Sequence, residues 1–309
     1  IPLSWRLWGE VAVKESVRWV EGHEIVADLA EQTPETRLVY VADREGDLRA
    51  LMDASARRGH PADWLVRATH NRNTAAGEKV WHRVEQTQAL GEVEFTLPAT
   101  PGRPARPVRQ TLYRDTVTLP ARKGAPAVTV TAILAREERP PAGEQAIVWR
   151  LSTNRPAETL ETVVELIDWY RRRWLVEIFF RILKSGCRVE SLQLGTLERL
   201  ERALVIYLII AWRILHRVTW GREHPNLSCE VVFDPEEWQA AWIVARRTKP
   251  PDTPPPLGHM TRLIAGFGGF LGRKGDGPPG PKAIWEGMQK VYAFALGIAA
   301  AKQAFIPSG

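Results

Sequence analysis

The sequence predicts an α/β fold that carries an antiparallel β insertion and ends in helices. Two apolar runs, at 37–42 and 64–68, are typical of buried strands and flank a helical pattern at 48–58. Strand, helix and strand in this order indicate an α/β sheet. Between 80 and 153 apolar residues alternate with a period of two, as at Glu92–Leu97, and Pro- and Gly-rich breaks separate the runs. This texture indicates antiparallel strands.

These patterns divide the chain into four parts. We expect the first part of the α/β core at 1–79, the β-rich insertion at 80–153, the second part of the core at 154–220, and a helical region at 221–309. Helices are predicted at 14–32, 48–58, 158–183, 197–218 and 282–303. Asp47 is the predicted N-cap of the second of these helices, because a carboxylate there can accept a hydrogen bond from a free backbone N–H.

The composition is that of a globular protein with a basic excess. Of the 309 residues, 44% are hydrophobic and 25% are charged, and the net charge is +6. A basic chain suits a polyanionic partner such as DNA, although many basic proteins bind no polyanion. Cys187 and Cys229 give neither a disulfide framework nor a zinc-ligand spacing, which favours a reducing cytosol and so a cytoplasmic location.

One apolar run has to be weighed against a membrane span. It covers 203–215, but it contains Arg213 and is too short to cross a bilayer. We interpret it as a buried core helix, and we expect no membrane partner.

Polar residues recur at helical spacing in the predicted helix 158–183 and just beyond it. They are Tyr170, Arg173, Glu177, Arg181 and Lys184, which share one stripe at 3.6 residues per turn. One carboxylate among cations suits a metal ion held beside a phosphodiester. The ordinary alternative is a solvated face with ion pairs between Glu177 and the arginines on either side of it.

Asp43 directly follows the first predicted strand. In open α/β sheets the carboxyl ends of the strands form the edge where active sites lie. Phosphodiester chemistry with two divalent ions needs about three carboxylates from different elements, and Asp43 and Glu177 are candidates for two of them. The alternative is that Asp43 is an ordinary turn or N-cap aspartate.

The spacing of these residues resembles a family signature. Tyr170, Arg173, Glu177 and Lys184 match, without a gap, the signature of the insertion-sequence-four family of DDE transposases, the Tn-five-like group. Asp43, followed by Arg44 and Glu45, is similar to that family's second catalytic aspartate. The Gly-rich stretch 268–280 also resembles family members. The resemblance implies an RNase-H-like mixed sheet core, interrupted by a β subdomain and followed by a helical carboxyl-terminal region.

The resemblance also implies roles for individual residues. Asp43 and Glu177 would be catalytic and would ligate two divalent ions, Mg²⁺ or Mn²⁺. The residues that would bind DNA are Tyr170, Arg173, Lys184, Trp149, Arg67 and Arg181, with His70 and Arg72 as further candidates. Trp149 would stack on an extruded base, although a core tryptophan on an apolar strand is an equal alternative. The implied partners are transposon ends, target DNA and a second copy of the chain, with the last helix either packed on the core or at the dimer surface.

The sequence departs from the family pattern on the amino-terminal side of Asp43. The family's first catalytic aspartate ends an earlier strand, and Asp28 is the aspartate that precedes Asp43 here. Asp28 lies in a helical pattern, so we reject it as that ligand and expect the chain to be amino-terminally truncated. The predicted function is therefore metal-dependent strand cleavage and strand transfer at transposon ends. The alternative is a catalytically incompetent fragment that binds DNA or a partner.

Overall fold

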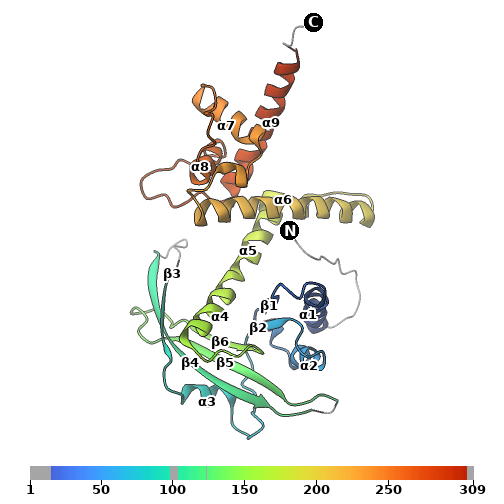
Figure 1. The fold of residues 1–309 in the computed structure, drawn as a ribbon, viewed down its shortest axis with the longest axis vertical. Coiled ribbons are helices and arrows are strands. Elements are labelled where there is room, and N and C mark those ends of the chain that lie inside the picture. Colours follow the sequence, from blue (N-terminus) through green and yellow to red (C-terminus); the bar gives the residue numbers. More distant parts are fainter. Residues whose placement is uncertain (1–14, 98–103, 123, 305–309) are drawn as a thin grey trace. The chain divides into compact units, whose positions relative to one another are not determined.

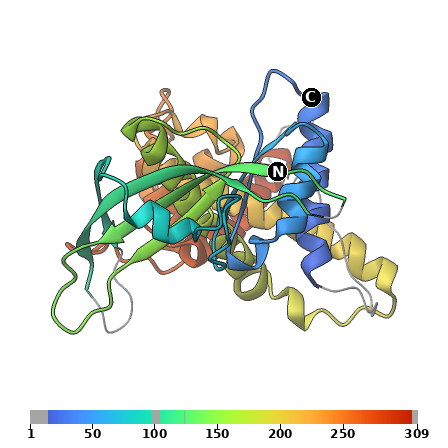
Figure 2. The same ribbon diagram turned by 90° about the horizontal axis from the view of Figure 1, so that it is seen from below.

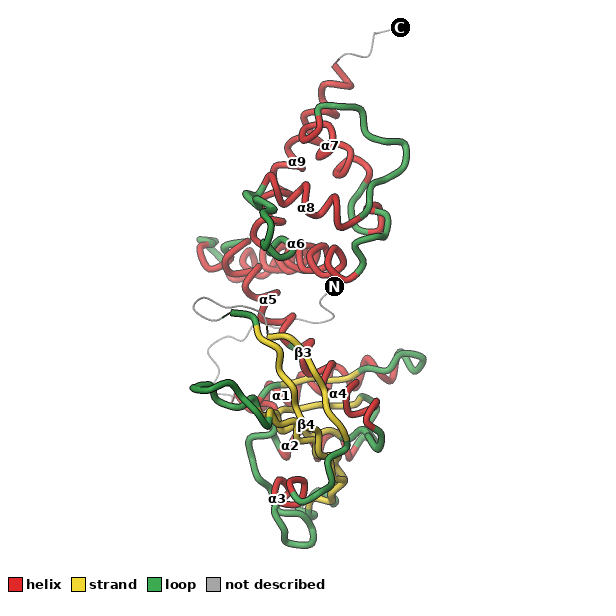
Figure 3. Tube along the Cα trace, turned by 90° about the vertical axis from the view of Figure 1, so that its left-hand side faces the viewer, coloured by secondary structure: helices red, strands yellow, loops and turns green. Residues whose placement is uncertain are grey.

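The computed structural model describes residues 15–97, 104–122 and 124–304. The described residues divide into two compact units, with the boundary in the chain between Arg173 and Trp174. We call the described residues up to Arg173 the sheet unit and those from Trp174 onward the helical unit, and describe each by itself. All strands of the described residues belong to the sheet unit, whereas the helical unit contains helices and loops (Figure 3).

The sheet unit is built on one mixed six-stranded sheet (Figure 1). Its strands are β1 (Val39–Ala42), β2 (Asp63–Arg67), β3 (Gly91–Leu97), β4 (Arg106–Leu119), β5 (Val128–Glu137) and β6 (Val148–Thr153). Their spatial order is β1-β2-β6-β5-β4-β3. β1 and β2 are parallel, and every other neighbouring pair is antiparallel. The expected α/β class is thereby confirmed, and the strands of 80–153 continue the same sheet through the pairing of β6 with β2.

Helices cover both faces of this sheet. They are α1 (Glu15–Gln32), α2 (Arg49–Arg57), α3 (Val80–Glu85) and α4 (Leu160–Arg172). Trp64 and Val66 of β2 pack in a cluster with α2 and α3, while Leu65 packs with α4 in a second cluster. Successive strand residues point to opposite faces, so β2 supplies both clusters. Figure 2 shows α3 lying along the long strands β4 and β5.

Several elements differ from the sequence-based expectation. The helix after β1 begins at Arg49, and its N-cap is Leu48, whose side chain makes no capping bond, so the prediction for Asp47 was wrong. α3 was not predicted within the β-rich segment. The predicted helix 158–183 is divided into α4 and α5 (Trp174–Arg181), with Arg173 between them, and a π turn (Ile182–Gly186) follows. Asp28 lies on α1, as expected, and pairs with Arg58.

The helical unit packs its helices around a separate apolar cluster. Besides α5, it contains α6 (Leu197–Glu223), α7 (Pro235–Arg246), α8 (Leu257–Phe267) and α9 (Pro281–Ala304). Ile214 of α6, Trp238 of α7, Ile264 of α8 and Ile284 of α9 are all buried in this cluster. α8 and α9 approach closely at Gly287, where an added Cβ would lie 2.1 Å from the carbonyl oxygen of Ile264. Only a residue without a side chain fits there.

α6 was expected to be a buried core helix, and this is only partly right. Ala211, Ile214 and Val218 are buried, but Ile206 and Ile209 are exposed. Among the described residues, α6 alone is long and apolar enough to cross a membrane, and 22% of its most apolar window is buried. Length and composition do not separate a span from a helix that packs one face on a core, and α6 does pack one face within the helical unit.

Candidate functional site

The carboxyl ends of β1 and β2 form the edge of the sheet where the predicted site residues gather. The two strands are parallel neighbours, with Ala42 paired to Val66. Parallel strands end at the same edge, so Asp43, just after β1, and Arg67, the last residue of β2, emerge side by side. This edge is the usual position of a ligand site in open α/β sheets.

Asp43 begins a short turn. Its carboxylate Oδ1 accepts a 2.8 Å hydrogen bond from the backbone N–H of Arg44, and so caps a single 3₁₀ turn (Arg44–Gly46). Gly46 is required by close packing, since a Cβ there would lie 2.4 Å from that of Ala42. The capping role foreseen as an alternative is therefore present. This capping bond uses one lone pair of Oδ1. The other lone pairs of the carboxylate can accept further bonds, and the Asp43 side chain is 37% exposed.

Two residues of the predicted signature reach Asp43 from the end of α4. The Tyr170 hydroxyl donates to Asp43 Oδ1 at 3.3 Å, although the two residues are 127 positions apart in the sequence. The Arg173 guanidinium lies 3.4 Å from Asp43 Oδ2. The structure thus brings together a carboxylate, a phenol and a guanidinium that were predicted separately.

Burial shifts the pKa of Tyr170. It raises the pKa of the phenol above its ordinary value, while the hydrogen-bonded guanidinium of Arg67 lowers it and the charge of Asp43 raises it again. A phenol is protonated at neutral pH even at its ordinary pKa, and the net rise moves its deprotonation further from neutral pH, so the hydroxyl remains a donor to Asp43. Arg67 is thereby placed within the same cluster as Tyr170, Arg173 and Asp43.

Trp149 of β6 extends this cluster with an aromatic row. Its ring centroid is 5.9 Å from that of Tyr170 in an edge-to-face arrangement, and 5.3 Å from that of Phe95 in a stacked one. The guanidinium of Arg171 lies 4.6 Å from the centroid of Phe95 on the same row. Trp149 is half-buried and packs against the apolar cluster of α4, so it has both a core contact and a stacking partner.

The remaining signature residues belong to the helical unit. Glu177 is half-buried on α5, and Arg181 is exposed at its end. Lys184 lies in the π turn, where its side chain is 60% exposed and its Nζ is 3.3 Å from Glu190. A π turn closes hydrogen bonds between residues five apart, as Cys187 N–H to Ile182 O does here at 2.9 Å. The α-helical spacing on which the expected stripe depends therefore ends at Arg181, before Lys184.

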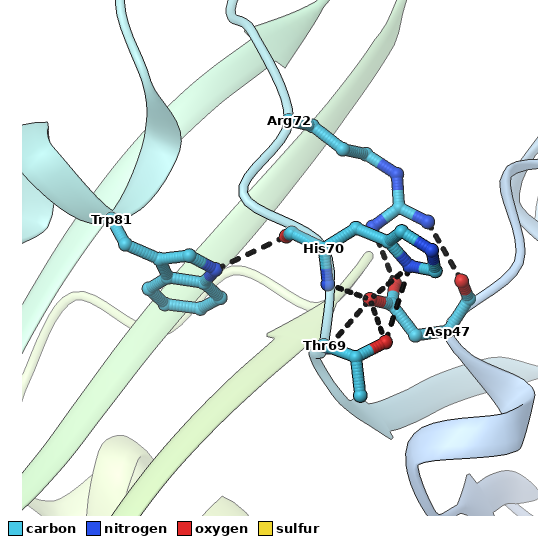
Figure 4. A network of polar contacts seen from close by, with 5 residues as sticks. All are labelled: Asp47, Thr69, His70, Arg72 and Trp81. Carbon is cyan, nitrogen blue, oxygen red and sulfur yellow. Dashed lines mark hydrogen bonds and ion pairs between the residues drawn. The ribbon is translucent and has the colours of Figure 1, made fainter.

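A buried polar network at the same sheet edge was not predicted. Asp47 ends the turn that Asp43 begins, and its side chain is fully buried. It binds the loop after β2 through Thr69, His70 and Arg72 (Figure 4). Arg72 is only 15% exposed and is engaged by Asp47, whereas the His70 side chain is 64% exposed. The sequence showed two aspartates four residues apart, but no signal for which loop either would contact.

The donor chemistry of Asp43 fits one ligand of a divalent metal ion. Mg²⁺ prefers carboxylate oxygens, is held by one or two of them, and keeps several waters. Within residues 15–97, 104–122 and 124–304, no cluster of three His, Cys, Asp or Glu side chains has metal-binding geometry. Asp43 would therefore be one ligand among several, and water and DNA phosphates can supply oxygen ligands as well.

Comparison with protein families accounts for nearly the whole chain. Residues 20–213 match the family described as transposase DDE domain, which is more than half of the sequence. The chain belongs to the DDE transposase family. Residues 209–306 match the transposase Tn5 dimerisation domain, so the family suggested by the signature is confirmed. All residues of the proposed site lie within the first match, and α7, α8 and α9 lie within the second.

Proposed function

We propose that this transposase cuts and joins DNA at transposon ends in a metal-dependent reaction, with Asp43 and Glu177 as catalytic carboxylates. The observation that carries the proposal is the contact of Asp43 with Tyr170 and Arg173 at the carboxyl edge of β1. A carboxylate that serves only as a turn cap does not need two further partners, one on α4 and one at its C-cap. Membership of the DDE transposase family supplies the reaction class.

Two divalent ions, Mg²⁺ or Mn²⁺, complete the proposed site, with Asp43 and Glu177 among their ligands. Ions bound there would activate the attacking oxygen and stabilise the negative charge that develops on the leaving oxygen of the phosphodiester. The protein residues prepare this site in two ways. Arg173 offsets the charge of Asp43, and Tyr170 holds the orientation of its carboxylate by donating to one oxygen.

The cations and aromatic rings around Asp43 are proposed to hold the DNA. Arg67, Arg173, Arg181 and Lys184 would pair with backbone phosphates, which fix the position of the duplex without reading its sequence. Trp149, already stacked against Phe95, offers a ring to an unpaired base. Tyr170 has one hydroxyl proton, so it would donate to a phosphate oxygen in place of its hydrogen bond to Asp43.

The end of α9 is proposed as the surface where two copies meet. Its first half is packed in the helical unit through Ile284, Met288 and Val291. In its second half, Tyr292 and Leu296 are 59% and 65% exposed. These exposed side chains lie within the match to the Tn5 dimerisation domain. A cytoplasmic, nucleoid-associated location is proposed with this function, because the substrate is chromosomal DNA.

A cleavage assay tests the proposal. The protein is incubated with DNA carrying the ends of its own element, in Mg²⁺ and in Mn²⁺. Asp43→Asn and Glu177→Gln are each expected to lower the cleavage rate by roughly 10³-fold or more, while DNA affinity changes little. Asp53→Asn is a matched control, since Asp53 is a buried carboxylate of the same unit, paired with Arg49. DNA binding without cleavage by the unaltered chain would instead support the alternative of an incompetent DNA-binding fragment.

A further inference from the structure

Asp47 stands at the opposite end of the turn from Asp43 and has a different environment. Asp43 is 37% exposed, whereas the Asp47 side chain is completely buried. The backbone N–H of Asp47 bonds to the carbonyl of Arg44 at 3.2 Å and closes the turn. A turn of this length has few hydrogen bonds of its own. Contacts that fix Asp47, the last residue of the turn, therefore also restrict Asp43, the first.

The Asp47 carboxylate is surrounded by donors from one loop (Figure 4). Oδ2 accepts hydrogen bonds from the backbone N–H groups of Thr69 and His70 at 2.7 and 2.9 Å. The Thr69 hydroxyl and His70 Nδ1 lie 3.3 and 3.1 Å from the same oxygen. Arg72 donates to Oδ1 and also, at 2.7 Å, to the backbone carbonyl of Asp47. Hydrogen bonds to a charged acceptor are about twice as strong as those between neutral groups.

These contacts join the two loops that carry the site. Residues 69–72 directly follow β2, whose last residue is Arg67, and the 43–47 turn directly follows β1. The loop after β2 is itself anchored on its other side, because Trp81 Nε1 donates to the His70 carbonyl at 3.3 Å. The backbone N–H of Trp81 also donates to the Asn71 side chain at 3.1 Å. Asp47 thus connects the turn of Asp43 to α3 through the loop after β2.

Asp47 is unsuited to bind the metal or the DNA directly. Its two oxygens are occupied by donors, and its charge is offset by Arg72, which is only 15% exposed. Of the two aspartates that bracket the turn, only Asp43 offers an accessible carboxylate. The role that remains for Asp47 is to fix the positions of Asp43 and Arg67.

We infer that Asp47 is a positioning residue of the transposase site, which holds Asp43 for metal binding by fastening the 43–47 turn to the loop after β2. This inference rests on the proposed function only in naming the metal as the ligand of Asp43. The link between the 43–47 turn and the loop after β2 is independent of that proposal. Asp47 forms this link without contacting the metal or the DNA.

Hydrogen exchange tests the fastening in the absence of metal. Asp47→Asn removes the charge that gathers Thr69, His70 and Arg72. We expect exchange at 43–48 and 69–72 to accelerate by about tenfold or more, which corresponds to about 1.4 kcal/mol of local opening, with the rest of the sheet unit unchanged. Glu137→Gln is the matched control, because Glu137 is equally buried and is bonded to Arg106 and to the N–H of Ile147. Unchanged exchange at 43–48 in Asp47→Asn would overturn the inference.

A Mn²⁺ titration of the same proteins, followed by electron paramagnetic resonance, tests the consequence for the site. Asp43→Asn should abolish the high-affinity site. Asp47→Asn should keep the number of sites but weaken the affinity by about tenfold, and Glu137→Gln should leave the affinity unchanged. Equal affinity in Asp47→Asn and the unaltered chain would overturn the inference. If the unaltered chain takes up no Mn²⁺, the proposed function fails at Asp43, and the exchange result alone decides the fastening.

Two milder variants keep the test decisive if Asp47→Asn does not fold. His70→Ala and Thr69→Val each remove one side-chain contact to Asp47 and leave the backbone hydrogen bonds in place. Both side chains are on the exposed loop, so folding should be retained. Smaller increases in exchange, confined to 43–48 and 69–72, are expected. An increase spread over the whole unit would contradict a local fastening.

Discussion

Two turns carry residues of the proposed site: the 43–47 turn and the π turn Ile182–Gly186. They differ in how firmly their side chains are held by the surrounding residues. The 43–47 turn of the sheet unit is fastened by the fully buried side chain of Asp47. The π turn of the helical unit buries Ile182 and Leu183, yet Lys184 is 60% exposed and its partner Glu190 is 69% exposed. The first turn is therefore ordered before any ligand arrives, whereas we expect the Lys184 side chain to become ordered when a phosphate binds. A rigidly held side chain suits a metal ligand, whereas a flexible lysine suits a contact with a phosphate of the DNA backbone.

The largest effect is expected from the residue that links the first turn to the core. Tyr170 is 6% exposed, packs in the apolar cluster of α4 and donates to Asp43. Tyr170→Ala should lower the free energy of unfolding by about 3–5 kcal/mol, because it leaves a cavity. Tyr170→Phe keeps the ring and should cost about 1 kcal/mol or less. Urea denaturation measures both, and equal losses in the two variants would show that packing of the ring is unimportant.

An intermediate effect is expected on DNA binding at the second turn. Lys184→Gln removes one phosphate contact and should reduce the slope of log affinity against log salt by about 0.9 on duplex DNA. Arg109→Gln is the control, since Arg109 is likewise exposed, at 65%, and paired with a glutamate, Glu94 on the neighbouring strand, but does not belong to the proposed site. Fluorescence anisotropy at several salt concentrations gives both slopes. An equal reduction of the slope in the two variants would mean that Lys184 contributes no more to DNA binding than another exposed cation.

The smallest effect is expected from the ion pair that Lys184 makes within the protein. Exposed pairs contribute about 0–1 kcal/mol, because water screens them and both side chains lose freedom. Glu190→Gln should therefore change the free energy of unfolding by less than about 1 kcal/mol, and DNA affinity should stay equal or rise as Lys184 is released. A loss above about 2 kcal/mol would instead place the π turn among the firmly held parts of the chain.

The sequence predicted the sheet edge well, because its signals are local. Two short apolar runs flanking a helical pattern were sufficient to place β1 and β2, and Asp43 follows directly from the end of the first. The spacing then matched a family signature, and two of its residues, Tyr170 and Arg173, contact Asp43 in the structure. Glu177 and its role remain a prediction, as do the DNA contacts.

What the sequence did not predict depends on contacts between distant segments. Asp47 looked like a helix cap, but its hydrogen-bond partners lie more than twenty residues later, on a loop whose path only the folded sheet determines. The π turn has no marker in the sequence, and it ends the α-helical spacing at Arg181, before Lys184. α7 could have been found, because Asp234 and Glu237 form a capping box and Pro235 occupies the first turn. The exposed side of α6 depends on what packs against it, which periodicity does not reveal.

The central claim, that Asp43 holds a catalytic metal ion, is tested most directly by exchanging the ligand atom. Asp43→Cys replaces oxygen by sulfur, which binds Mg²⁺ poorly and accepts softer ions such as Mn²⁺ better. Cleavage of DNA carrying the transposon ends is measured in each metal, beside the unaltered protein. The account predicts loss of cleavage in Mg²⁺ and partial recovery in Mn²⁺ for the variant. Equal cleavage in the two metals, or full activity in Mg²⁺, would contradict it.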